Sequence, residues 1–293
     1  MNAVYQKELR SYFANPVGSL FIALMLSAVG LFFTMTNLRA GYPLFEYALS
    51  ANSGAMVFVL LMPLLAMRSF AEERHAKTDQ LLYSLPVSGA DVVMGKFFAL
   101  ATVSAVPTAV LCLFPPILSL YADAGSFGYA GAYTALFFFY LLGLALGAVC
   151  MFLSSLAESQ IVAAVTGAFT LLGIYFLPRI AAMLPATGIA SVGGFLLLIF
   201  AAALILYRVT GSVNLCLFSA LGLCVVLLAA YLIAPDWFLG SFSSLLRALG
   251  LFELLNGVIY GGLFDLKVCV TYLSVTAFFL LLTVMVLEKR RWN

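Results

Sequence analysis

Long stretches without any charged side chain dominate this sequence. Because a hydrocarbon core about 30 Å thick needs roughly 20 apolar residues in helical form, a stretch of that length predicts a transmembrane helix. Lipid gives the backbone no hydrogen-bond partner, so the spans must be helical. The sequence predicts an all-α integral membrane protein with about eight transmembrane helices, within residues 17–38, 47–67, 97–122, 124–157, 159–178, 180–207, 209–235 and 268–287.

The composition supports one membrane domain over the whole chain, residues 1–293. Hydrophobic residues make up 65% of it and charged residues only 9%, against about 25% in soluble domains. No segment is long and polar enough to form a separate soluble domain. The formal net charge of +2 argues against nucleic acid as a partner.

The distribution of basic residues predicts the orientation. Lys7 and Arg10 precede the first span, which places the N-terminus in the cytoplasm. With eight spans the C-terminus is cytoplasmic too, and ten basic residues fall inside against four outside, as expected for a multi-pass protein of the plasma membrane. Six spans with one re-entrant pair would preserve this bias. The outer four are Arg39, Arg179, Arg247 and Lys267.

Residues 1–15 are expected to form an amphipathic helix on the membrane surface. Apolar residues recur there at helical spacing, with polar residues on the opposite side. A plain cytoplasmic leader is the alternative. The residues expected to define this interfacial helix are Lys7, Glu8, Arg10, Tyr12 and Phe13, together with Val4, Tyr5, Gln6 and Leu9.

The main charged cluster follows span two. Pro86 disfavours a helical residue before it, so a helix leaving the membrane should end at Leu85. Ser88 and Asp91 fit a capping box that begins the next helix. The segment therefore predicts a stiff cytoplasmic coupling helix between spans two and three, with an ordinary solvated face as the alternative. Its residues include Glu72, Glu73, Arg74, His75, Lys77, Thr78, Asp79, Leu81 and Leu82.

Span four carries a helix-packing motif and is followed by an inner turn. Gly143 and Gly147 form a GxxxG pattern, which permits close helix packing and, less often, a dimer contact. Ser155 and Glu158 fit a second capping box, predicted to open span five just before Gln160.

The later part of the chain predicts an extra pair of spans and an outer helix. Two apolar helices are expected near 191–207 and 213–233, joined by a tight turn at 208–212. Residues 236–267 are expected outside, with one amphipathic helix on the surface or dipping into the bilayer. In span three, Pro107, Pro115 and Pro116 predict kinks.

Motifs for enzymatic chemistry are not found. The single histidine, His75, has no nearby Cys or His, and the five cysteines lie within apolar runs, so no metal site is predicted. Residues 89–97 read GADVVMGKF, but a phosphate loop needs four residues between its glycines and Ser or Thr after the lysine. We therefore expect no ATP site and no enzymatic activity in this chain.

Four segments together resemble the ABC-2 type transporter permeases, most closely the gliding-motility branch. They cover nearly the whole chain in the family's order. The similar residues are Lys7 to Phe13 with Pro16 and Gly30 to Phe33; Met67 to Arg74 with Thr78, Leu81, Leu82, Ser84, Pro86, Val87, Gly95 and Lys96; Ser154, Ser155 and Glu158 to Val162; and Asp265, Leu266, Tyr272 to Ser274, Glu288 and Arg290 to Trp292.

The resemblance implies a permease subunit of an ATP-driven exporter. Two permease copies or homologues would pair with two separate ATPase subunits, which would bind ATP and Mg²⁺. The segment from Glu72 to Pro86 would dock into the ATPase and couple hydrolysis to translocation. The other hypothesis is a membrane scaffold or assembly factor that transports nothing.

Overall fold

The described part of the chain is helical. The computed structural model describes residues 2–76, 88–121, 128–210, 213–261 and 264–292, with backbone only for 204–210, 213–216 and 291–292. Helices, turns and connections account for these residues, without a strand. This confirms the all-α class. The described helices that are long and apolar enough to cross a membrane number six: Pro16–Arg39, Phe45–His75, Gly89–Ser119, Tyr129–Leu156, Gln160–Met183 and Leu266–Arg290.

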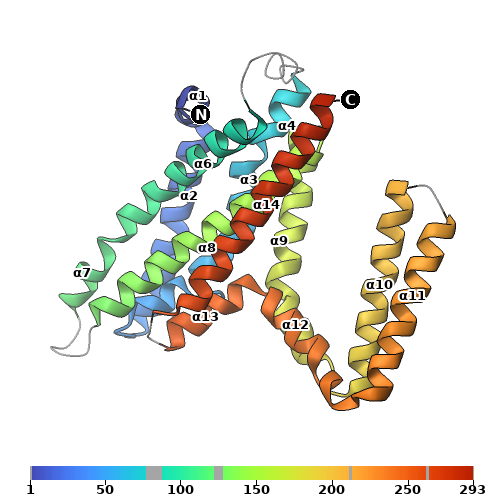
Figure 1. The fold of residues 1–293 in the computed structure, drawn as a ribbon. Coiled ribbons are helices and arrows are strands. Elements are labelled where there is room, and N and C mark those ends of the chain that lie inside the picture. The colour runs from blue at the N-terminus through green and yellow to red at the C-terminus, as the bar shows by residue number, and fades with distance from the viewer. Residues whose placement is uncertain (1, 77–87, 122–127, 211–212, 262–263, 293) are drawn as a thin grey trace. The chain divides into compact units, whose positions relative to one another are not determined.

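The chain divides into two compact units. The first unit comprises residues 1–175 and 251–293, and the second comprises residues 176–250. That the two form one membrane domain stays a prediction. Figure 1 traces the elements of the first unit, which are α1 (Asn2–Ala14), α2 (Pro16–Phe33), η1 (Thr34–Arg39), η2 (Phe45–Leu49), η3 (Gly54–Val57), α3 (Phe58–Ala66), α4 (Arg68–His75), α6 (Gly89–Leu111), α7 (Phe114–Ser119), α8 (Tyr129–Leu156), most of α9 (Gln160–Met183), α13 (Leu251–Gly261) and α14 (Leu266–Trp292).

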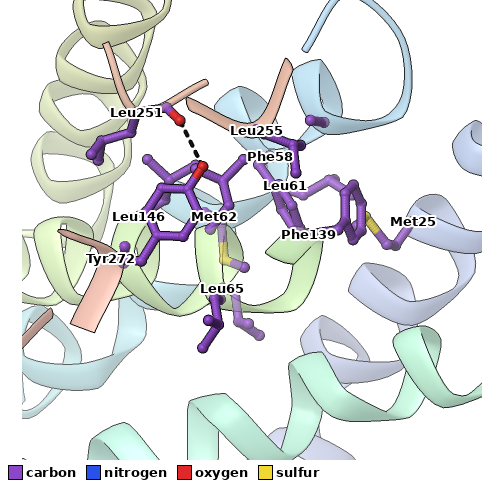
Figure 2. Close-up of a cluster of buried hydrophobic side chains, with 14 of the residues drawn as sticks. Met25, Phe58, Leu61, Met62, Leu65, Phe139, Leu146, Leu251, Leu255 and Tyr272 are labelled. Carbon is purple, nitrogen blue, oxygen red and sulfur yellow. Dashed lines mark hydrogen bonds between the residues drawn. The ribbon is translucent and has the colours of Figure 1, made fainter. Parts of the chain in front are cut away.

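Helix α8 lies at the centre of the first unit and packs against α3, α6, α13 and α14. Its Phe139 ring lies 4.6 Å from the Phe58 ring of α3, between centroids. On another side of α8, the buried Tyr272 of α14 donates a hydrogen bond of 2.8 Å to the carbonyl of Leu251 (Figure 2). This polar contact is satisfied inside an apolar core, and it fixes the start of α13 against α14.

Two of the glycines of α8, Gly143 and Gly147, permit close approach within the chain. A Cβ atom on Gly147 would lie 2.8 Å from Cδ2 of Leu100 in α6, and one on Gly143 would lie 3.0 Å from Cε of Met62 in α3. Both glycines are buried. The GxxxG pattern therefore serves packing between helices of one unit in this structure.

The prolines of span three divide it. Pro107 lies inside α6, but the helix ends at Leu111 and a new helix, α7, begins at Phe114, with Pro115 in its first turn. Proline is tolerated in a first turn because its missing N–H would have no partner there. The interruption thus falls where the sequence predicts a kink.

The second unit contains the predicted extra pair of helices. These are α10 (Gly188–Thr210) and α11 (Val213–Ile233), which pack side by side and are followed by η4 (Pro235–Phe238) and α12 (Ser241–Leu249). Taken together, the segments 217–233 and 235–249 are long and apolar enough for one span. They are bent by 116° relative to each other, however, so they form one span only if it is a broken one. The described helices thus support six spans, or seven with this bent pair, and the count of eight stays a prediction.

The amphipathic helix predicted within residues 236–267 is present as α12, but it is shorter than the apolar stripe suggests. The segment forms η4, α12 and α13, with breaks at Gly240 and Gly250. Gly240 has a φ of 67°, a left-handed conformation that favours glycine. The apolar stripe is divided as well, because Phe252 is buried in the first unit whereas α12 belongs to the second.

Candidate functional site

A cluster of charged side chains joins α1, α4 and α6 at one end of the first unit. Nζ of Lys96 in α6 lies 2.9 Å from Oε1 of Glu8 in α1 and 2.9 Å from Oε2 of Glu73 in α4. Nζ of Lys7 lies 3.0 Å from the other oxygen of Glu73. We call Lys7, Glu8, Glu73 and Lys96 the charge cluster. It ties three helices whose sequences are far apart.

Lys96 is the centre of the charge cluster and is only 2% exposed. Its ammonium group also donates to the carbonyl of Ser69 at 2.5 Å and lies 5.1 Å from the ring centroid of Phe70. A buried ammonium group is costly unless its charge is paired and its protons are hydrogen-bonded. Two carboxylates, a carbonyl and an aromatic face meet that need here.

Lys7 completes the charge cluster at its surface, with a side chain 65% exposed. Partial burial acts to lower the pKa of Lys7, but the hydrogen bond to Glu73 and the negative charges of Glu73 and Glu8 outweigh it. The net result raises the pKa above the ordinary lysine value. Lys7 is therefore fully charged at neutral pH, and Glu73 receives a cation on each oxygen.

The other side of α4 is bound to the end of α8. The Ser154 hydroxyl accepts hydrogen bonds from the backbone N–H groups of Phe70 and Ala71, at 3.3 and 3.2 Å, and donates to the carbonyl of Met67 at 3.1 Å. Met67, the N-cap of α4, makes no side-chain capping bond. Ser154 therefore supplies the cap of α4 from a neighbouring helix.

Arg74 links α4 to the turn between α8 and α9. Its Nη1 atom donates to the carbonyl of Ala157 at 2.6 Å, and Nη2 donates to the carbonyl of Ser155. Arg68 forms two hydrogen bonds with Glu72, at 2.7 and 2.6 Å, as the pairing one turn apart predicts. Of the predicted coupling residues, Glu73 and Arg74 thus bind other helices, while Glu72 pairs within α4.

Helix α1 forms where the sequence predicts it, but its packing face is not purely apolar. Glu8 and Tyr12 are buried against the rest of the unit, whereas Arg10 is exposed and Phe13 is 52% exposed. Burial raises the pKa of Tyr12, whose neutral hydroxyl donates to the carbonyl of Leu65 at 3.2 Å. The contact of α1 with a membrane surface stays a prediction.

Of the two predicted capping boxes, the structure shows the N-cap bond of one. The Ser88 hydroxyl accepts from the backbone N–H of Asp91 at 3.1 Å and begins α6 as expected. The box of Ser155 and Glu158 is wrong, because Ser155 lies inside α8 and donates to the carbonyl of Phe152. Ser159 takes its place, accepting from the N–H of Val162 at 3.3 Å before α9 begins at Gln160. Glu158 is exposed.

The rest of the predicted coupling segment lies outside the described residues, namely Lys77, Thr78, Asp79, Leu81, Leu82 and Pro86. Sequence reasoning in turn missed the partners of α4. It assigned no ion pair to Lys96 and gave Ser154 no role of its own. A lysine directly before the long apolar run of residues 97–122 gives no signal of a buried ion pair, because lysines are common at interfacial helix ends.

We predict that Ser154→Ala lowers the free energy of unfolding by about 1–3 kcal/mol, because it removes the acceptor of two buried backbone N–H groups. Ser155→Ala is the matched control, since that neighbouring buried hydroxyl bonds only within its own helix. Thermal unfolding in detergent compares the two variants. Equal melting temperatures would show that Ser154 does not hold α4.

Comparisons with protein families and with curated proteins do not assign this chain to a family. The chain matches no protein-family model, and no curated protein shows significant similarity to it. The helices define the class of a multi-pass α-helical membrane protein. Within that class, the distinguishing feature is a short helix, α4, that is held by buried polar contacts to α1, α6 and the α8–α9 turn.

Proposed function

We propose that the chain is a transport permease that takes its energy from a partner protein. Specifically, it is the membrane-spanning subunit of an ATP-driven ABC-2 type exporter, with α4 as the start of the segment that contacts the ATPase. The observation that carries this proposal is the binding of α4 on two sides, by Lys96 through Glu73 and by Arg74 to the α8–α9 turn.

Such an arrangement is suited to transmitting force. A push on a helix that is tied to three others moves them together, whereas a slack loop would absorb the displacement. Rigid groups of helices that move against each other provide alternating access in transporters. Glu73 and Arg74 are accordingly positioning residues that hold α4, and the exposed end of α4 at His75 is the nearest described point for contact with a partner.

The proposal includes the assembly and the orientation. The α4 end of the first unit faces the cytoplasm of the plasma membrane, with both termini on that side, which the excess of inside lysines and arginines supports. A second permease copy or homologue completes the translocation path. Separate ATPase subunits bind ATP and Mg²⁺, because the glycine spacing of residues 89–97 does not fit a phosphate loop.

A photo-crosslinking amino acid in place of His75 tests the proposal. In native membranes we expect an adduct with a protein that contains GxxxxGK[ST], and we expect that protein to co-purify with the wild-type chain. The same crosslinker in place of Glu253, an exposed residue of α13, is the control, because helix α13 lies far from helix α4 in Figure 1. If neither adduct nor co-purifying ATPase is found, the chain is not such a permease and a non-transporting scaffold becomes the better hypothesis.

A further inference from the structure

A second buried acidic side chain, Glu46, lies at the opposite end of the span that contains α4. The span runs from Phe45 to His75, and Glu46 belongs to its first turn, η2. Glu46 is only 7% exposed. Its Oε2 atom has no hydrogen-bond partner among the described residues. Unlike Glu8 and Glu73, it forms no ion pair with a lysine in the described part of the chain.

Glu46 lies in a tightly packed part of the first unit. Its Oε1 atom contacts Gly131 of α8 so closely that a Cβ atom at that position would collide with it. The neighbouring residues Phe45, Ala48 and Leu49 are fully buried, and the Phe45 ring packs against Phe33 at 5.9 Å between centroids. Gly131 therefore provides the space that the carboxyl group fills.

The elements packed against η2 bring no charge to Glu46. These are α2, α7, α8, η1 and η3, together with α13, whose Tyr260 ring packs against Tyr47. Their described charged residues are Arg39 of η1 and Glu253 of α13, and both are exposed. The tyrosines of α8 donate their hydroxyls elsewhere: Tyr129 to Ser119, Tyr133 to the carbonyl of Cys112 and Tyr140 to the carbonyl of Ala101. On η2 itself, the Tyr47 ring packs against the rings of Tyr42 and Tyr260.

Within the described ranges of the chain, an ionised carboxylate in this position would lack both a counter-charge and a hydrogen-bond donor for Oε2. Such a group is far more costly to bury than a neutral carboxylic acid, which carries its own donor. A metal ion does not offer an alternative, because the described residues contain no group of three or more His, Cys, Asp or Glu that is able to hold one. A proton, in contrast, neutralises the Glu46 carboxylate without needing any additional space beside it.

We propose that Glu46 is a proton-binding site, at which a neutral carboxylic acid packs against Gly131 and holds η2 on α8. When the proton is lost to hydroxide in the solvent, water is formed and the carboxylate requires hydration. The contact between η2 and α8 must then open. Because η2 leads through η3 into α3 and α4, proton binding at one end of this span bears on the position of α4 at the other.

Infrared difference spectroscopy tests this site directly and does not depend on the transport proposal. We expect the purified wild-type protein at neutral pH to show the C=O stretching band of a protonated carboxylic acid, and to lose it at alkaline pH. Glu46→Gln, which keeps the shape and neutrality of the side chain, should lack this band. Glu253→Gln, at an exposed glutamate, should retain it.

A second variant keeps the proposal testable if Glu46→Gln does not fold. Gly131→Ala keeps the carboxyl group but displaces it, so we expect the band to vanish at neutral pH. Thermal unfolding provides a further readout: the folded wild type holds one more proton than the unfolded chain, so its stability falls as pH rises through the titration of the site. That fall should be absent in Glu46→Gln. An unchanged band in Glu46→Gln, or its absence in the wild type, overturns the proposal.

Discussion

Lys96→Met is expected to lower the free energy of unfolding by about 3–5 kcal/mol, since removal of one partner leaves buried charges uncompensated. Methionine keeps the apolar stem of lysine, so packing changes little. The ammonium group that lies 2.9 Å from both Glu8 and Glu73 is lost, however. The measurement is thermal unfolding in detergent, together with the fraction of monodisperse protein in size-exclusion chromatography.

Lys7→Met provides the matched control. Lys7 binds the same carboxylate, Glu73, at 3.0 Å, but its side chain is 65% exposed. Exposed ion pairs contribute only about 0–1 kcal/mol, so this variant should unfold close to the wild-type temperature. If Lys96→Met is no more destabilising than Lys7→Met, then Lys96 does not hold α1, α4 and α6 together.

Neutralising Glu8 and Glu73 as well distinguishes the effect of unpaired charge from the effect of altered packing. Lys96→Met combined with Glu8→Gln and Glu73→Gln leaves no uncompensated carboxylate at the centre of the cluster. Replacement of a whole buried ion pair is often neutral, whereas removal of one member is not. We therefore expect the triple variant to be more stable than Lys96→Met alone. A triple variant of lower stability would mean that the losses simply add.

The helical course of the chain was predictable because it depends on local signals. Apolar length sets the spans, Pro16 begins α2, and the Ser88 hydroxyl caps α6. Each of these signals acts within a few residues, and the sequence displays them directly. The extra helices α10 and α11 followed from apolar length in the same way.

The charge cluster was not predictable, because it depends on contacts between distant segments. Glu8 and Lys96 are 88 residues apart, and only the packing of α1 on α6 brings them together. In the sequence, a lysine next to an apolar run is typical of an interfacial helix end. Helical periodicity places Lys96 on a face of α6 but does not tell whether that face meets lipid, water or another helix.

Competing local signals explain the two wrong boundaries. Ser154, Ser155 and Ser159 all precede the fifth span, and spacing favoured Ser155 with Glu158 as a cap. Helix α8 continues to Leu156 because Ser154 and Ser155 are buried by α4, so the cap falls on Ser159. Within residues 236–267, the apolar stripe suggested one helix, although Gly240 and Gly250 were available as signals of its ends.

Gly18→Ala should detach α1 from the remainder of the first unit. Asn15 has an extended backbone, with φ of −97° and ψ of 151°, and turns the chain sharply from α1 into α2. A Cβ atom on Gly18 would lie 2.5 Å from the carbonyl oxygen of Tyr12. Because that atom belongs to the backbone, no side-chain rotation relieves the collision, and α1 must move as a whole.

Movement of α1 would weaken the contacts that it makes with two other helices. The Tyr12 hydroxyl would leave the Leu65 carbonyl, and Glu8 would leave Lys96. The loss in free energy of unfolding should therefore exceed the approximately 1–3 kcal/mol usual for overpacking.

Gly30→Ala in the same helix α2 is the control, since a Cβ atom there meets nothing within 4 Å. Alanine favours a helix over glycine by about 1 kcal/mol, so Gly30→Ala should raise the melting temperature slightly or leave it unchanged. Opposite effects of one chemical change in one helix would show that the α1–α2 corner depends on close backbone approach. Equal effects would show that α1 is held loosely, in which case a push on α4 would not reach α1.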